Sequence, residues 1–314
     1  VPPTRLVGGP EAVRYGSLWE RLVRGVRWSW IDPRYQSALP PDLDASVMTL
    51  DSRDRLHAKQ GRSTARVVFH PAAAAADRAS GTAQCAGASA GPVAVYLKRH
   101  FRLPWLARLA ALFDPAGRHS PAAAEWVHLE RARALGVPVP EVVATGERIG
   151  PWACLQSYLM VAELTGCQEL NVALPELAYE LEPAAFESLK RRLIAEMARI
   201  TAALHTARVF HKDLYLCHFY LDLERLRDDP AEVRLVLIDF HRLAEHRLWP
   251  DRWRWKDLGQ LLYSTAGVAG IDNRDICRFW KDYRRRVSLR APRWQARMVQ
   301  LKAAAYLEHN RSRT

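Results

Sequence analysis

Two segments that follow a long amphipathic pattern carry residues able to do chemistry. The first, RVFHKDLYLCHFYLDL at 208–223, contains a His-Lys-Asp triplet at 211–213. The second, VRLVLIDFHRL at 233–243, has an apolar run that ends at Asp239. A carboxylate at the end of a buried strand is costly without a partner, so this position favours a metal ligand. An isolated His-x-Asp triplet occurs by chance, but here a helix precedes it and a strand-Asp follows.

The elements before these segments are predicted to be mainly strands. Residues 57–71 predict a strand, a turn at Gly61 and a second strand. The alternation of residues 92–101 predicts another strand and turns Lys98 away from the apolar face. Between them, the Ala/Gly/Ser-rich stretch at 72–91 predicts a mobile insertion.

Helix signals frame the next part of the chain. Ser120 is the expected N-cap of a helix that ends near Gly136, and residues 152–164 predict a further strand. Apolar residues spaced by three and four then predict an amphipathic helix, at Phe186, Leu189, Leu193, Met197, Ile200 and Leu204. A buried strand is expected at 233–238, and helices from about 255 to the end of the chain.

These elements predict an α+β chain with a sheet-rich part and a helical part. We expect an N-terminal extension at 1–56 that packs on the first lobe, with a short helix and a loop within 15–45. A sheet-rich lobe at 57–162 and a helical lobe at 163–314 follow, joined near Ala162–Glu163.

Composition narrows the class of protein. Hydrophobic residues make up 49% of 314 residues, which suits a folded protein, and no apolar run is long enough to cross a bilayer. The N-terminal residues lack the apolar core of a secretory signal, and the five scattered cysteines form no CxxC pair, so we expect a cytoplasmic location with reduced thiols. A net charge of +12 favours anionic partners.

The motif order resembles the eukaryotic-type protein-kinase fold: a strand lysine, a helix glutamate, a His-x-Asp loop and a strand-end Asp-Phe-x. The sequence is more similar still to the lipopolysaccharide kinases, which phosphorylate core sugars such as heptose or Kdo. HKDLYLCHF and IDFHR resemble that family's catalytic loop and metal segment, as do YLKRH and AEWVHLERARALGVPVP. The resemblance covers roughly residues 57–264.

The resemblance implies a two-lobed protein-kinase-like fold and ATP-dependent transfer of a phosphoryl group to an alcohol, where positioning and charge neutralisation dominate. Lys98 would hold the α- and β-phosphates, and Glu125 would fix Lys98, with Glu130 as the reserve acid. Asp213 would accept or orient the proton of the sugar hydroxyl, and His211 would brace the loop.

The resemblance also implies a metal site for Mg²⁺, or alternatively Mn²⁺, at Asp239. His218 stands where protein kinases carry asparagine, and it is either a metal ligand, a phosphate contact or an ordinary loop histidine, since Mg²⁺ prefers oxygen. Asp257 resembles the aspartate that holds the catalytic loop from a helix.

Nucleotide contacts are less well marked. KQGRSTAR carries one glycine in place of GxGxxG, so the phosphate lid is expected either to be formed by Gly61 with the amides of Ser63 or Thr64, or to be loose. Glu163, at the expected junction of the lobes, is a further nucleotide-binding candidate.

Three function classes remain. The first is a sugar kinase for an anionic glycolipid, the lipopolysaccharide core, which works in the cytoplasm or peripherally on the inner membrane face. Residues 99–113 are relevant to that location, because they predict either a helix in the membrane interface or an ordinary inter-lobe helix. The second is a kinase for a protein Ser/Thr or another small alcohol. The third is a non-catalytic nucleic-acid binder, which the presence of Lys98, Asp213 and Asp239 opposes. GASAG at 87–91 matches a hydrolase motif but lacks its strand and helix context.

Overall fold

The computed structural model describes most of the chain, at residues 4–5, 8–10, 17–50, 55–59, 61–70, 91–102, 105–113, 120–150 and 154–311, with the backbone alone at 4–5, 55–59, 107 and 110–112. All but Gly91 of the expected insertion at 72–91, including most of GASAG, lies outside these residues. The chain forms two compact units, Val1–Val127 with Glu141–Glu163, and His128–Pro140 with Leu164–Thr314. The three-part division expected from the sequence stays a prediction.

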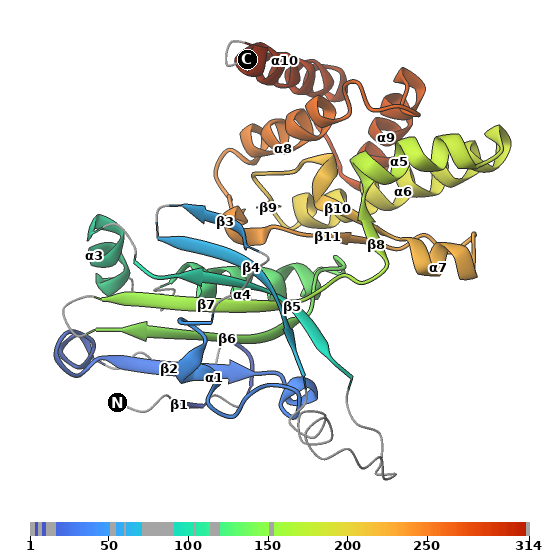
Figure 1. Cartoon of the computed structure of the whole chain (residues 1–314). Helices are drawn as coiled ribbons and strands as arrows, with labels where there is room; N and C mark the ends of the chain where they lie inside the picture. Colours follow the sequence, from blue (N-terminus) through green and yellow to red (C-terminus); the bar gives the residue numbers. More distant parts are fainter. Residues whose placement is uncertain are drawn as a thin grey trace, which may run out of the picture. The chain divides into compact units, whose positions relative to one another are not determined.

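The first unit is built on a seven-stranded sheet in the order β1-β2-β6-β7-β5-β4-β3 (Figure 1). Its neighbours are antiparallel, except that β1 and β2 run parallel. The strands are β1 (Thr4–Arg5), β2 (Val26–Ile31), β3 (Arg55–Lys59), β4 (Arg62–Phe69), β5 (Val93–His100), β6 (Val142–Ile149) and β7 (Leu155–Ala162). Gly61 turns β3 into β4 with φ of 75°, a conformation that favours glycine, so the predicted hairpin is confirmed.

The core of the first unit joins the sheet to residues that precede β3. Val95 and Leu97 of β5 are fully buried and share one apolar cluster with Leu39, Leu43 and Val47. Two of these belong to or follow α1 (Leu43–Ser46), and the single-turn η3 (Pro33–Tyr35) precedes it. The N-terminal segment therefore contributes apolar side chains to the core that fixes β5.

The expectation of a short helix and a loop within residues 15–45 is partly wrong. A short π-helix, η2 (Glu20–Arg24), is followed by strand β2, which pairs antiparallel with β6. The indole of Trp28 lies 6.0 Å and that of Trp30 lies 4.9 Å, between ring centroids, from Trp126 of α4 (Pro121–Ala134). Packing against this helix makes the tryptophan-rich segment a strand, which its period-2 Trp-Ser-Trp spacing could have indicated.

The helix caps of α4 agree with the sequence. The Ser120 hydroxyl accepts a hydrogen bond from the Ala123 amide at 3.1 Å, and Gly136 follows the helix with φ of 73°. The helix begins in the first unit and ends in the second. Another helix of the first unit, α3 (Trp105–Phe113), exposes four large apolar side chains: Trp105, Leu106, Leu109 and Phe113.

The second unit is mainly helical (Figure 1). Its later helices are α5 (Leu170–Glu180), α6 (Pro183–Thr206), α7 (Leu223–Asp228), α8 (Pro250–Ser264), α9 (Asn273–Arg286) and α10 (Pro292–Arg311). Its strands are β8 (Cys167–Glu169), β9 (Val209–Phe210), β10 (Phe219–Asp222), β11 (Leu235–Leu237) and β12 (Ala244–Glu245), and its short turns are η4 (Leu216–His218) and η5 (Phe240–Arg242). The strands pair as a β11-β10-β8 sheet and a β12-β9 ladder.

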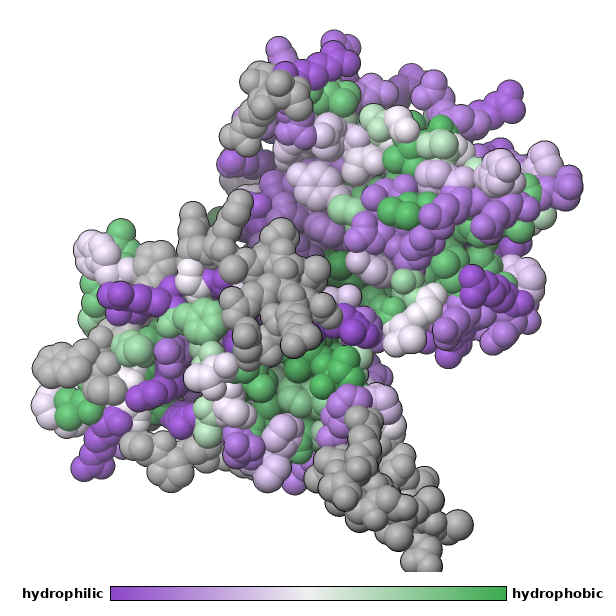
Figure 2. Space-filling view, viewed as in Figure 1, coloured by the Kyte–Doolittle hydropathy of each residue, from purple (hydrophilic) through white to green (hydrophobic). Residues whose placement is uncertain are grey.

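Helix α6 contributes apolar side chains to the core of this unit. All six apolar residues that predicted its buried face are buried, and α8 starts at Pro250, slightly before the expected 255. Apolar side chains of four helices meet in one cluster, with Ala198, Leu258, Tyr283 and Val299 among its members. In the view of Figure 2, hydrophilic side chains cover much of the second unit, with smaller hydrophobic areas between them.

Candidate active site

Lys98 in β5 and Glu125 in α4 form an ion pair in the first unit. Lys98 Nζ lies 2.5 Å from Glu125 Oε1, and the glutamate side chain is 5% exposed. β5 has a neighbour on each side, with Lys98 opposite Thr64 in β4 and Leu159 in β7, so the backbone that carries the lysine is held in the sheet interior. Glu130, the reserve acid, instead pairs with Arg133 one turn along its own helix. The structure therefore selects Glu125 as the partner of Lys98.

The three residues expected to form the phosphate lid differ in their position and in their exposure to solvent. Gly61 occupies the turn, and its carbonyl accepts the Phe101 amide at 2.8 Å. Ser63 is buried, while Thr64 is half-buried and lies across from Lys98. β4 is paired on both sides, so the amides of Ser63 and Thr64 lie within the sheet ladder. Of these groups, the Thr64 side chain is the one that the strand register places beside the lysine.

Glu163 follows β7 and is held by Arg66 of β4. Two hydrogen bonds, of 2.6 and 2.7 Å, join the guanidinium to the two carboxylate oxygens. This contact with Arg66 lowers the pKa of Glu163. A carboxylate engaged in this bidentate pair fixes two strands, so any contact of residue 163 with a nucleotide is more easily made by its backbone.

The catalytic-loop candidate lies in the second unit and is clamped from α8. Asp257 is fully buried, and its Oδ2 and Oδ1 accept the backbone amides of His211 and Lys212, each at 2.8 Å. Lys212 has φ of 67°, a conformation rare for a non-glycine residue and common at functional sites. The expectation that Asp257 braces this loop is confirmed.

His211 ties the loop to the segment that contains Asp239. Its Nε2 lies 3.0 Å from the carbonyl oxygen of Ile238, and its ring packs edge-on against Phe240 at 5.1 Å between centroids. Complete burial lowers the pKa of His211, which favours the neutral imidazole. A neutral ring with its proton on Nε2 donates to Ile238 and fixes the spacing of the two segments.

Asp213 is surrounded by three polar side chains that the sequence did not single out. Arg242 Nη1 lies 3.1 Å from both carboxylate oxygens, Gln260 Nε2 donates to Oδ1 at 3.3 Å, and Lys256 Nζ lies 4.0 Å from Oδ1. Burial lowers the pKa of Lys256, and the charge of Asp213 opposes this shift. The segments IDFHR and RWKDLGQ contained these residues, but nothing local showed that their side chains converge on one carboxylate.

Asp239 and His218 face each other in the same unit. Asp239 adopts the left-handed conformation, with φ of 67°, and its Oδ2 lies 3.8 Å from His218 Nε2. His218 Nδ1 lies 2.7 Å from the backbone oxygen of Asp213, an acceptor, so Nδ1 carries a proton, and the other ring nitrogen, Nε2, is turned toward Asp239. The other Asp239 oxygen lies 2.5 Å from His241 Nδ1.

Asp239 and His218 fit a divalent cation that takes most of its ligands from phosphate and water rather than from the protein. Among the described residues, no group of three or more His, Cys, Asp or Glu side chains could hold a metal ion. Mg²⁺ bound with nucleotides uses one or two carboxylates and completes its shell with phosphate and water oxygens. Asp239 supplies such a carboxylate, and His218 supplies an oriented imidazole beside it.

A family model described as "Lipopolysaccharide kinase (Kdo/WaaP) family" matches residues 98–283 of the 314. The chain belongs to this family. The matched stretch starts at Lys98 and includes Glu125, Asp213, His218 and Asp239. The family resemblance inferred from the sequence is thereby confirmed.

Curated relatives of this lipopolysaccharide kinase family member carry one name. The lipopolysaccharide core heptose(I) kinase WaaP of Pseudomonas aeruginosa is 35% identical over 162 residues, which cover 52% of this chain and 59% of that protein. WaaP of Escherichia coli K12 is 34% identical over 160 residues, covering 51% and 58%. The match thus spans less than two thirds of the length of these relatives.

A solved structure described as "WaaP in complex with acyl carrier protein" is similar over most of its length. Its TM-score is 0.59 at 26% identity, covering 90% of this chain and 97% of that chain. This family member has the expected α+β, two-lobed protein-kinase-like fold. Among the residues that the structure describes, no helix has both the length and the apolar composition to span a bilayer.

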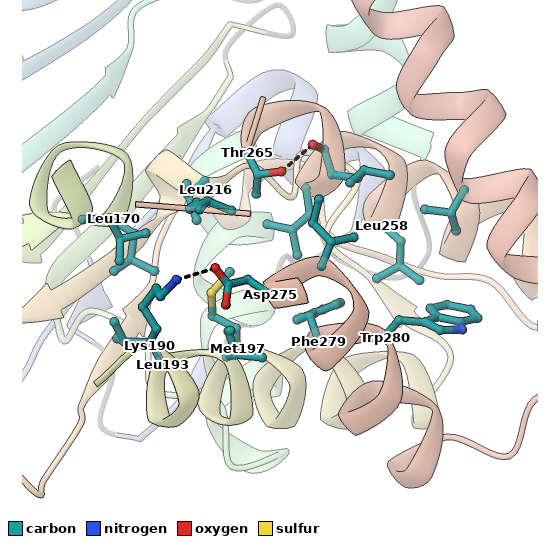
Figure 3. Close-up of a pocket in the computed structure, with 17 residues that line it drawn as sticks. Leu170, Lys190, Leu193, Met197, Leu216, Leu258, Thr265, Asp275, Phe279 and Trp280 are labelled. Carbon is teal, nitrogen blue, oxygen red and sulfur yellow. Dashed lines mark hydrogen bonds and ion pairs between the residues drawn. The ribbon is translucent and has the colours of Figure 1, made fainter. Parts of the chain in front are cut away.

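The second unit of this kinase family member also contains a large apolar pocket (Figure 3). It holds about 790 Å³ of empty space including its open mouth, and α6, α8 and α9 supply much of its wall. Figure 3 shows Leu193, Met197, Leu258, Phe279 and Trp280 around it. Its polar side chains are Thr265 and the two members of a buried ion pair of 2.7 Å between Lys190 Nζ and Asp275 Oδ2. Such a lining suits an apolar ligand and has no group placed for phosphoryl transfer.

Proposed function

We propose that this protein is an ATP-dependent kinase that phosphorylates a sugar hydroxyl, of heptose or Kdo, in the lipopolysaccharide core. One observation carries the proposal: His218 bonds to the backbone of Asp213 through Nδ1 and turns Nε2 toward the Asp239 carboxylate. Phosphoryl transfer to an alcohol needs two groups from this lobe, a proton acceptor and a metal ligand. The imidazole of His218 contacts the candidates for both, Asp213 and Asp239.

Each residue has a distinct part in this reaction. Asp213 would accept the proton of the attacking hydroxyl, while Lys98, fixed by Glu125, would contact the α- and β-phosphates of ATP. Asp239, with His218 beside it, would hold Mg²⁺ or Mn²⁺. Such an ion would supply positive charge that neutralises phosphate oxygens.

The acceptor is inferred from the relatives and from charge. The curated relatives are named as heptose(I) kinases of the lipopolysaccharide core. A net charge of +12 suits an anionic glycolipid, and Arg242 beside Asp213 is 49% exposed, so it can meet an anionic group of the acceptor. We therefore place the enzyme in the cytoplasm and peripherally on the inner membrane face, where such a glycolipid presents its sugars.

The test follows γ-labelled phosphate from ATP into three acceptors: lipopolysaccharide core that lacks the phosphate, a protein mixture, and a panel of small alcohols. We expect label on the core with the parent chain and a loss of at least about 100-fold with Asp213→Ala or Asp239→Ala. Asp282→Ala removes a carboxylate of the same size from α9 and should leave the rate unchanged. Label on protein or small alcohols, and none on the core, would reject this acceptor.

Binding can be tested before the acceptor is known. ATP with Mg²⁺ or Mn²⁺ should raise the melting temperature of the parent chain, and Asp239→Ala should abolish the shift. No shift, together with tight and steeply salt-dependent binding of DNA or RNA, would favour a kinase-like nucleic-acid binder.

A second interaction is favoured by the apolar pocket. The solved WaaP neighbour was determined in complex with acyl carrier protein. We propose that this chain also binds acyl carrier protein and takes the attached acyl chain into the pocket of Figure 3, whose lining is mainly apolar.

Filling the pocket tests this interaction. Leu193→Trp should weaken binding of palmitoyl-acyl carrier protein at least about tenfold. Leu301→Trp enlarges an exposed leucine of α10 and serves as the matched control. Equal binding by both variants, once circular dichroism shows that both are folded, would place the acyl chain elsewhere.

A further inference from the structure

Leu248 and Trp249 project from the link between β12 and α8. Their exposed fractions are 81% and 83%, although both are large and apolar. Trp249 has φ of 57° and ψ of 49°, a left-handed conformation that is an outlier for a bulky residue, and Pro250 begins α8 directly after it. Within the described part of the second unit, these two neighbouring apolar side chains bury little surface and so contribute little to stability. An exposed apolar pair of this kind indicates a surface that a partner covers.

The base of this projection is tied to the loop that carries Asp213. The His246 amide donates to the Arg208 carbonyl at 2.9 Å, and the His246 ring stacks on Trp253 at 4.1 Å. Lys212, the residue before Asp213, places its ammonium 4.7 Å from the Trp253 ring centroid. A partner that contacts Leu248 and Trp249 therefore lies near the loop that carries Asp213.

Arginines flank the two apolar residues. The side chain of Arg247 is 80% exposed and pairs with Glu245, and Arg252 is exposed with no ion pair among the described residues. Asp251, the carboxylate between them, is already paired with Arg254 of α8. An exposed Leu-Trp pair with a cation on either side matches the bilayer interface, where tryptophan lies at headgroup level and arginine meets lipid phosphates.

We propose that residues 247–252 form a membrane-contact tip: Leu248 and Trp249 enter the interface of an anionic bilayer, and Arg247 and Arg252 bind its phosphate headgroups. The purpose of the tip rests on the proposed function, because a kinase for a membrane-anchored glycolipid must bring Asp213 to the lipid surface. The binding itself does not depend on catalysis and can be measured without it.

Co-sedimentation with vesicles tests the tip. The full chain should bind vesicles of phosphatidylglycerol and phosphatidylcholine, and the double variant Leu248→Ser, Trp249→Ser should bind roughly tenfold or more weakly. Arg252→Gln should lose about fivefold on these vesicles and little on pure phosphatidylcholine. Tyr179→Ser is the matched control, since Tyr179 of α5 is 93% exposed and lies outside the tip.

A kinase assay adds a second readout. The double variant should keep parental activity on a soluble, deacylated core oligosaccharide and lose activity on acceptor embedded in vesicles. If no acceptor is phosphorylated by any variant, the proposed function fails while the vesicle result still decides the tip.

The following results would overturn the proposal. The parent chain could fail to bind anionic vesicles, or the double variant could bind as tightly as the parent. Alternatively, Leu106→Ser with Phe113→Ser could abolish binding that the tip variant leaves intact, which would assign the membrane contact to α3. Loss of acyl carrier protein binding in the tip variant, without vesicle binding by the parent, would assign the surface to a protein.

Discussion

Asp257 and His211 are joined by a hydrogen bond of 2.8 Å from the His211 amide to Asp257 Oδ2, although 46 positions separate them in the chain. The second oxygen accepts the next amide, that of Lys212, at the same distance. One buried carboxylate thus satisfies two consecutive amides in a loop with no other regular structure. The position of Asp213 depends on this clamp.

Replacing Asp257 with asparagine should therefore cost both stability and rate. Asparagine keeps one acceptor oxygen and turns an NH₂ group toward the other amide, leaving a buried donor unpaired. We expect a loss of about 2–4 kcal/mol in the free energy of unfolding, measured with urea. Asp282→Asn on α9 should change it by less than about 0.5 kcal/mol. Identical urea midpoints for the parent and Asp257→Asn would show that the clamp is not needed.

The Lys98–Glu125 pair predicts which acid supports nucleotide binding. Glu125→Gln should leave the lysine without its fixed anionic partner and lower kcat/KM by roughly 10- to 100-fold, with Lys98→Met at least as severe. Glu130→Gln is the internal control, because Glu130 pairs only locally with Arg133 in the described structure. A larger loss for Glu130→Gln than for Glu125→Gln would contradict the assignment.

His218 distinguishes a protein-kinase-like metal site from one that needs an imidazole. Asparagine at this position can accept a metal but cannot also donate to Asp213 with the same geometry. If His218 orients both segments, His218→Asn should weaken Mg²⁺ binding about tenfold or more, read from the metal dependence of the ATP thermal shift. Full retention of activity and of metal affinity would instead show that the histidine acts as the usual asparagine does.

Glu147 of β6 should make stability depend on pH. Burial raises the pKa of its carboxyl from 4.5 to about 8, with the Ser120 hydroxyl opposing the shift. Between these pH values the folded state holds a proton that the unfolded state has released, so this group lowers the free energy of unfolding as pH rises. The slope approaches about 1.4 kcal/mol per pH unit.

Glu147→Gln removes this titration. The free energy of unfolding of the variant, measured from about pH 5 to about pH 8, should fall less with pH than that of the parent. The comparison uses the slope, because the amide also changes packing equally at every pH. Parallel slopes for the two proteins would mean that Glu147 is ionised in the fold.

Much of the fold could be predicted because its signals are local. The hairpin at Gly61, the caps at Ser120 and Gly136, and the buried stripe of α6 follow from backbone preferences and periodicity within a few residues. Strand β2 was missed although its Trp-Ser-Trp spacing is a local signal; what no local signal shows is the helix that this face packs against, through the contact of Trp28 and Trp30 with Trp126.

By itself, the sequence determined the order and residue types of the site: a strand lysine, a His-x-Asp loop and a strand-end aspartate. Only the tertiary structure decided between Glu125 and Glu130, gathered Arg242, Lys256 and Gln260 around Asp213, and left Leu248 and Trp249 exposed. Local sequence patterns determine which helices and strands form. Which side chains come together depends on how elements far apart in the chain pack, and no single segment of the sequence shows that packing.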